Sequence, residues 1–187
     1  MRLLAVAASL AVLGAFAQAP DPSAALAAQK EAMKAFAFMN GVWRGPAWTL
    51  LPDGRKREIT QTERAGPFLD GTLKVVEGRG YLADGSVGFN ALGVIAYDVA
   101  ARKYTMRSWA QGRAGDFPIT PRPDGYTWET PAGPGAIIRY TATVQGDTFR
   151  EVGDRIVEGR EPMRIFEMDL KRVGDTNWPA GDAVPMR

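Results

Sequence analysis

The sequence contains no histidine and no cysteine among its 187 residues. Their absence excludes Ser-His-Asp and Cys-His nucleophilic sites, imidazole general bases and thiolate chemistry. The usual zinc ligands and the His or Cys ligands of haem are missing too, and no Asp-rich calcium loop is present. The composition argues against an enzyme and predicts neither a metal site nor a cofactor. Any catalysis would depend on Asp, Glu, Lys, Tyr or Ser.

The sequence also lacks an excess of charge of one sign, because it contains 23 Lys and Arg residues and 21 Asp and Glu residues. Without a basic stripe, binding to nucleic acid has no electrostatic support. Without cysteine, stability has to come from burial and hydrogen bonding instead of disulfides.

One long apolar run is present, over residues 3–16 after Arg2. It is shorter than the roughly 20 residues of a transmembrane helix, and small residues follow it, so we predict a signal peptide over 1–17. Cleavage after Ala19 is the alternative, but it would place Pro20 first in the mature chain. No cysteine follows for a lipid anchor. We therefore expect a periplasmic or secreted protein with no membrane span after the signal is removed.

The mature chain is predicted to begin with a helical segment over 20–40. Asp21 can cap a helix and Pro22 suits its first turn, while Asn40-Gly41 is a typical helix end. A single domain is expected over 41–173, followed by an irregular tail over 174–187.

Turn signals such as Pro52-Asp53-Gly54 and Pro123-Asp124-Gly125 recur through the expected domain, with alternating apolar and polar residues between them. No gap has room for a crossover helix, so the sheet must be antiparallel. About ten strands would leave open edges unless the sheet closed. We therefore predict an all-β fold, a closed up-and-down antiparallel β-barrel with an N-terminal helix. The expected strands are 42–51, 56–64, 71–81, 86–98, 103–111, 115–120, 125–130, 136–145, 148–157 and 163–173.

Strand alternation predicts which side chains face the barrel interior. Some polar residues share a face with apolar ones: Glu63 with Ile59, Arg79 with Val75, and Glu151 with Phe149. These positions indicate a polar patch in a ligand cavity, or else a bulge that swaps faces or an open rim. The predicted ligand-binding residues are Glu63, Arg79, Met106, Trp128, Tyr140, Phe149, Glu151 and Met168.

The segment Gly41-Val42-Trp43, which follows a helix and enters the first strand, resembles the start of the lipocalin-like, or calycin, superfamily. In that family an Arg of the last strand packs over the Trp and closes one end of the barrel, and Arg172 stands at the matching place. The resemblance covers roughly 36–173. It is nearest to small exported bacterial domains of fatty-acid-binding-like shape and unknown function. Haem-binding relatives use a proximal His, which this chain lacks. The segment Arg44-Gly45-Pro46-Ala47-Trp48 also departs from the lipocalin pattern, and we expect a bulge at Gly45-Pro46.

The resemblance and the polar patch together predict an exported protein that binds a small apolar or amphipathic molecule inside the barrel. The first alternative is an enzyme using carboxylate or Tyr acid-base chemistry on a small metabolite. The second is an interaction module. In strand 86–98 both faces are largely apolar, so the outer face would be covered by the N-terminal helix or would dock a partner, including a second copy in a homodimer.

Overall fold

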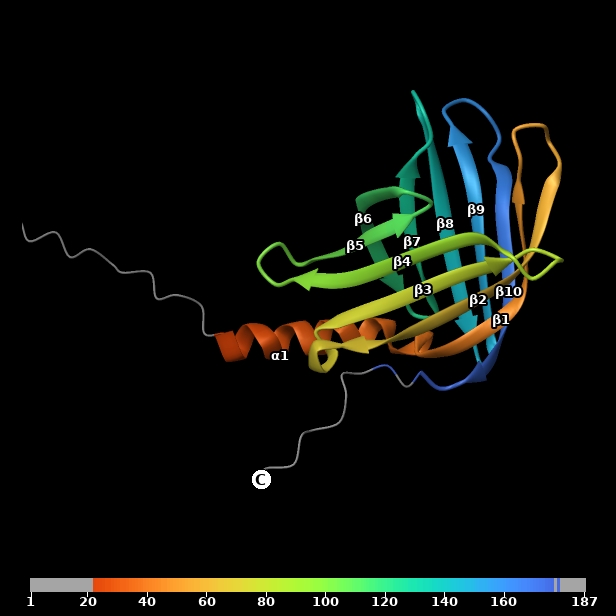
Figure 1. The fold of residues 1–187 in the computed structure, drawn as a ribbon. Helices are drawn as coiled ribbons and strands as arrows, with labels where there is room; N and C mark the ends of the chain where they lie inside the picture. The colour runs from red at the N-terminus through yellow and green to blue at the C-terminus, as the bar shows by residue number, and fades with distance from the viewer. Residues whose placement is uncertain (1–21, 177, 179–187) are drawn as a thin grey trace, which may run out of the picture.

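The computed structural model describes residues 22–176 and 178. The predicted signal peptide and most of the predicted tail therefore lie outside the described residues. A helix and a 3-10 segment precede ten strands, which form one closed antiparallel barrel in which each strand pairs with its chain neighbours and β1 pairs with β10 (Figure 1). The all-β fold and the up-and-down closed barrel predicted from the sequence are confirmed.

The elements are α1 (Pro22–Met33), η1 (Lys34–Met39), β1 (Gly41–Leu50), β2 (Lys56–Phe68), η2 (Leu69–Gly71), β3 (Leu73–Tyr81), β4 (Val87–Asp98), β5 (Lys103–Ala110), β6 (Arg113–Arg122), β7 (Gly125–Pro131), β8 (Ala136–Gln145), β9 (Thr148–Val157) and β10 (Met163–Gly174). The segment expected as one helix over 20–40 is thus divided between α1 and η1. Among the described residues, no helix is long and apolar enough to cross a lipid bilayer.

The helical segment lies at one end of the barrel, and the β1–β2, β7–β8 and β9–β10 turns lie at the other (Figure 1). We call these the closed end and the mouth. Phe36 and Met39 of η1 are fully buried in the barrel core. The Phe36 ring meets Tyr104 edge to face at 5.3 Å between ring centroids. The apolar residues that end the helical segment therefore form a plug.

Trp43 lies beside this plug and is 1% exposed. Its indole N–H donates to the Met39 carbonyl at 2.9 Å, and its ring meets Phe149 edge to face at 5.6 Å. Arg172 is the register partner of Trp43 on β10, and its guanidinium lies 6.0 Å from the indole centroid. This is the arrangement that the resemblance implied for Trp43 and Arg172.

Gly41 supplies the turn that brings the chain from η1 into β1. Its φ is +142°, a region that residues with a Cβ rarely adopt, and a Cβ here would lie 3.0 Å from Nε of Arg172. The prediction of a bulge at Gly45-Pro46 was wrong, because β1 stays in register with β2 through both residues. The irregularity lies instead between Val42 and Trp43 in the pairing with β10.

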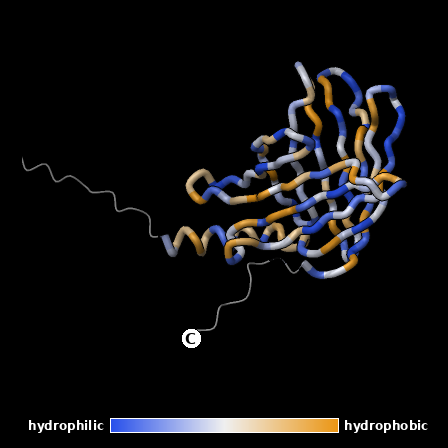
Figure 2. Tube along the Cα trace, viewed as in Figure 1, coloured by the Kyte–Doolittle hydropathy of each residue, from blue (hydrophilic) through white to orange (hydrophobic). Residues whose placement is uncertain are grey.

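Hydropathy along the chain follows the alternation of a barrel wall (Figure 2). On β5, Met106 is buried whereas Trp109 is 41% exposed, as predicted. On the outer face, Glu129 and Arg139 form a cross-strand ion pair at 2.7 Å.

The face assignment of β3 was wrong. Leu73, Val75, Glu77 and Arg79 were expected inside, but Lys74, Gly78 and Gly80 are the buried residues. The inward glycines contribute no hydrophobic signal, so the adjacent Val75-Val76 pair left the alternation ambiguous. A Cβ on Gly78 would lie 2.8 Å from a carboxyl oxygen of Glu63. Glycine is needed there because polar side chains of β2 fill the space.

Candidate functional site

Inward-facing side chains become more accessible from the closed end toward the mouth. Near the closed end Phe36, Trp43 and Phe149 are at most 1% exposed. Toward the mouth, inward residues are only partly buried; these are Ile59, Phe117, Tyr140 and Phe166. The barrel therefore has the form of a cup with a packed base.

Two carboxyl side chains, Glu63 of β2 and Glu151 of β9, lie on the inner wall above that base; we call them the carboxyl pair. Glu151 is 8% exposed. Glu63 is partly accessible although it is the register partner of the buried Trp43. Glu63 therefore keeps some accessible surface on the inner wall of the barrel.

Hydrogen bonds hold each carboxyl in place. The Gln61 amide donates to Glu63 Oε1 at 2.7 Å, and the Trp128 indole N–H donates to Glu151 Oε1 at 3.0 Å. Gln61 is 2% exposed, and its Oε1 accepts no hydrogen bond within the part of the chain that the structure describes. The site therefore contains one buried acceptor that is left open.

Both carboxyls are more basic than an ordinary glutamate. Burial, against the opposing hydrogen bond from Gln61 and with a smaller contribution from the negative charge of Glu151, raises the pKa of Glu63 to about 8. Burial also raises the pKa of Glu151 to about 7, against the opposing effect of hydrogen bonds from Trp128 and Tyr126. Both carboxyls therefore change between the protonated and the ionised form near neutral pH.

Aromatic rings of β6, β7, β8 and β10 form the wall next to Glu151. The Trp128 and Tyr140 rings are stacked, with centroids 4.3 Å apart and an interplanar angle of 12°. Phe117 lies 5.5 Å from Trp128, and Phe166 lies 6.0 Å from Tyr140. Gly153 makes room for this wall, since a Cβ there would lie 2.9 Å from the Tyr140 ring.

The predicted ligand-binding residues divide into three groups. The structure brings Trp128, Tyr140 and Glu151 together and places Glu63 on the same interior. Met106, Phe149 and Met168 also face inward, but they are part of the buried core, with Phe149 against Trp43 at the base.

Arg79 does not belong to the site. It lies on the outer face of β3, where its guanidinium pairs with Glu77 at 2.6 Å and its side chain is 48% exposed. Gln61, Tyr126, Phe117 and Phe166 were not among the predicted ligand-binding residues. The inward parity of Gln61 and Glu63 could have identified Gln61, since both share a face with Ile59.

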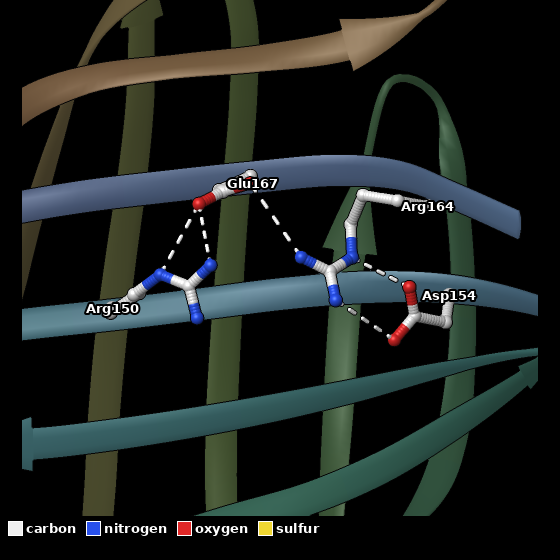
Figure 3. A network of polar contacts seen from close by, with 4 residues as sticks. All are labelled: Arg150, Asp154, Arg164 and Glu167. Carbon is white, nitrogen blue, oxygen red and sulfur yellow. Dashed lines mark hydrogen bonds and ion pairs between the residues drawn. The ribbon is translucent and has the colours of Figure 1, made fainter.

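Several carboxylates on the outer surface form ion pairs with Arg or Lys. Across β9 and β10, Glu167 accepts from Arg150 at 2.6 Å and lies 3.6 Å from Arg164, which also binds Asp154 at 2.6 Å (Figure 3). Glu63 and Glu151, in contrast, have no ion pair with Lys or Arg in residues 22–176 and 178. In the same residues no cluster of three or more acidic side chains could hold a metal ion.

A hollow of about 490 Å³ is lined by Trp48, Tyr81 and Leu82, and also by the inward residue Ile59. Lys56 lies over the Trp48 ring at 3.6 Å. The outer face of β4 and β5 is also left partly uncovered by the helix, with Leu92 38% and Trp109 41% exposed. The homodimer through this face remains a prediction.

No family model and no curated protein matches the chain. Among solved structures, it is similar to the crystal structure of Rv2717c from M. tuberculosis, with 13% sequence identity and a TM-score of 0.57. The match covers 76% of this chain and 97% of that one. At this identity the likeness shows the fold alone, a closed antiparallel barrel that fits a calycin-like architecture.

Proposed function

We propose that this chain is an exported lipocalin-like protein that binds a small apolar or amphipathic molecule in its barrel. The observation that carries the proposal is a carboxyl pair on the inner wall with which no Lys or Arg of the described residues forms an ion pair, next to an open Gln61 acceptor. Polar groups of this kind are costly to bury unless something satisfies them. A ligand with a polar end toward the pair and an apolar body along the aromatic wall would satisfy them.

The fold supports the location of this site. Trp43, Phe36 and the last turn of the helical segment close one end, so a ligand would enter through the mouth. The partly buried rings of Phe117, Tyr140 and Phe166 lie between the mouth and the carboxyl pair and offer apolar contact area. Export, and with it a periplasmic or secreted location, belongs to the same proposal and depends on residues 1–17.

Tryptophan fluorescence tests ligand binding directly. We expect a saturable change when the purified protein is titrated with a member of a panel of fatty acids, isoprenoids and aromatic compounds. Trp128→Phe should remove most of this change, because Trp128 lies on the aromatic wall. Trp109→Phe is the matched control, since Trp109 is exposed on the outer face. If no panel member gives a saturable change, and native mass spectrometry of protein from its own source finds no bound molecule, the proposal is wrong.

A second candidate function is acid-base catalysis on a small metabolite. It is favoured by two carboxyls on one interior, Glu63 and Glu151, whose pKa values are both raised by burial toward neutrality. A group that gains and loses a proton near the working pH is what general acid-base catalysis requires.

If the protein is an enzyme, it should chemically change at least one compound in a mixture of small metabolites. The protein incubated with a metabolite extract should consume at least one compound. Replacing either carboxyl with Gln should stop that consumption, whereas Glu129→Gln on the outer face should not. Identical metabolite profiles with and without the wild-type protein would count against an enzyme and leave the binding function standing.

A further inference from the structure

We infer that the polar end of the ligand is an organic cation, such as a protonated amine, which the acceptors of Gln61, Glu63 and Glu151 recognise. This inference rests on the proposed function and specifies the chemical class of ligand for the same site. It comes from three features of the interior: its hydrogen-bonding groups, its charge and its aromatic wall.

The hydrogen-bonding groups near the carboxyl pair are mostly acceptors. Gln61 gives its N–H to Glu63 at 2.7 Å, which leaves Gln61 Oε1 buried with no donor from residues 22–176 or 178. Glu63 has a second carboxyl oxygen, whereas Glu151 already accepts from the Trp128 indole N–H and from the Tyr126 hydroxyl. When ionised, a carboxylate can only accept hydrogen bonds. A ligand group rich in N–H donors is therefore the complement of this surface.

The charged groups of the interior also favour a cationic ligand. Lys74 also faces inward but lies toward the closed end, where its ammonium donates to the side-chain oxygen of Asn40. Arg155 has the inward parity of β9, and its register partner is Ile138, nearer the mouth than Tyr140. Tyr126 and Tyr140 are the inward titratable groups on β7 and β8, and burial raises the pKa of both, that of Tyr140 to about 12.

The other strands add little charge near the pair. The inward residues there on β4, β5, β6 and β10 are uncharged, and include Ile95, Met106, Ile119 and Met168. Glu77, on the outer face of β3, adds negative potential that raises the pKa of Glu63. Once ionised, the carboxyl pair therefore lacks a cation of its own. A cationic ligand would supply it.

The aromatic wall is the third feature. Trp128 contacts Glu151 and stacks on Tyr140, so a group that reaches the carboxylate also passes ring faces and edges. Indole and phenol rings attract organic cations through their electron-rich faces. Carboxylates next to aromatic rings thus favour an ammonium group on an apolar body over an alcohol or a carboxylate of the same shape.

A matched ligand series tests the inference. The full chain would be titrated by calorimetry with decylamine, 1-decanol and decanoate, and with 2-phenylethylamine, 2-phenylethanol and phenylacetate. In at least one series, we expect the amine to bind at least about tenfold more tightly than the alcohol at about pH 9, where both carboxyls are ionised and the amine is protonated. At about pH 5 the carboxyls are neutral, and this preference should fall below about threefold.

Proton linkage gives a second readout. A bound cation favours the ionised carboxyls, so amine binding near pH 7 should release protons. The release would appear as a dependence of the measured heat on the ionisation enthalpy of the buffer. The alcohol should release none.

Variants separate the carboxyl pair from the general surface charge. Glu63→Gln with Glu151→Gln should abolish the amine preference and the proton release. Glu129→Gln, which removes a paired outer carboxylate, should change neither. Equal or tighter binding of the alcohol or the acid at about pH 9, or an amine preference that survives the double substitution, overturns the inference but not ligand binding. If no compound in either series binds, and the wider panel also fails, both are overturned.

Discussion

Replacing Trp43 with alanine is expected to lower the free energy of unfolding by about 4 kcal/mol. Trp43 is 1% exposed and packs between Met39, Phe149 and Arg172. The substitution would leave a large cavity at the closed end and remove the donor to the Met39 carbonyl. Urea denaturation followed by circular dichroism would measure the change.

Trp109→Ala is the matched control, because it removes the same side chain from the outer face of β5. Trp109 is 41% exposed and its ring lies 5.4 Å from the Arg107 guanidinium. We expect a loss of less than about 1 kcal/mol. Similar losses for the two variants would show that Trp43 is not an essential part of the closed end.

The free energy of unfolding should fall as the pH rises from about 5 to about 9, by at least roughly 3 kcal/mol. The pKa of Glu63 is about 8 and that of Glu151 about 7 in the folded chain, against 4.5 for an ordinary glutamate. Between these values the folded chain holds protons that the unfolded chain has lost. The stabilisation is therefore complete below about pH 4.5 and is lost as the pH passes through 7 and 8.

Glu63→Gln combined with Glu151→Gln should remove most of this slope, because an amide of the same shape does not titrate. The double variant should be more stable than the wild type at about pH 9. Glu129→Gln with Glu167→Gln removes two carboxylates from the outer surface and should keep the wild-type slope. Denaturant curves across this pH range would reveal the difference, and a slope retained by the inner double variant would contradict the assigned burial of the pair.

Local sequence signals were enough to predict the barrel. Turn signals at Pro52-Asp53-Gly54 and Pro123-Asp124-Gly125 divide the chain into short alternating segments, and no segment between them could form a crossover helix. Antiparallel pairing of chain neighbours then follows, since hairpins need only short connections. The turn at Gly41 that leads into Trp43 could likewise be predicted from the local sequence. A glycine that ends a helix can adopt a φ that residues with a Cβ rarely adopt.

Which side chains meet inside the barrel could be predicted only in part. Glu63, Trp128, Tyr140 and Glu151 were placed inside by alternation, which gives the face of a residue but not its neighbours. The contact of Trp128 with Glu151 joins β7 to β9 across β8, a relation that depends on strand stagger and ring orientation. Arg79 was misplaced because inward glycines on β3 carry no hydrophobic signal.

The sequence by itself determined the strand order and the inward parity of most strands, because both depend on residues close together in the chain. It also excluded histidine and cysteine chemistry. Only the tertiary structure decided that Glu63 and Glu151 are buried on one interior, without a Lys or Arg partner among the described residues, and that burial raises their pKa values toward neutrality. That outcome depends on burial and on charges brought together from strands far apart in the sequence, which no local pattern records.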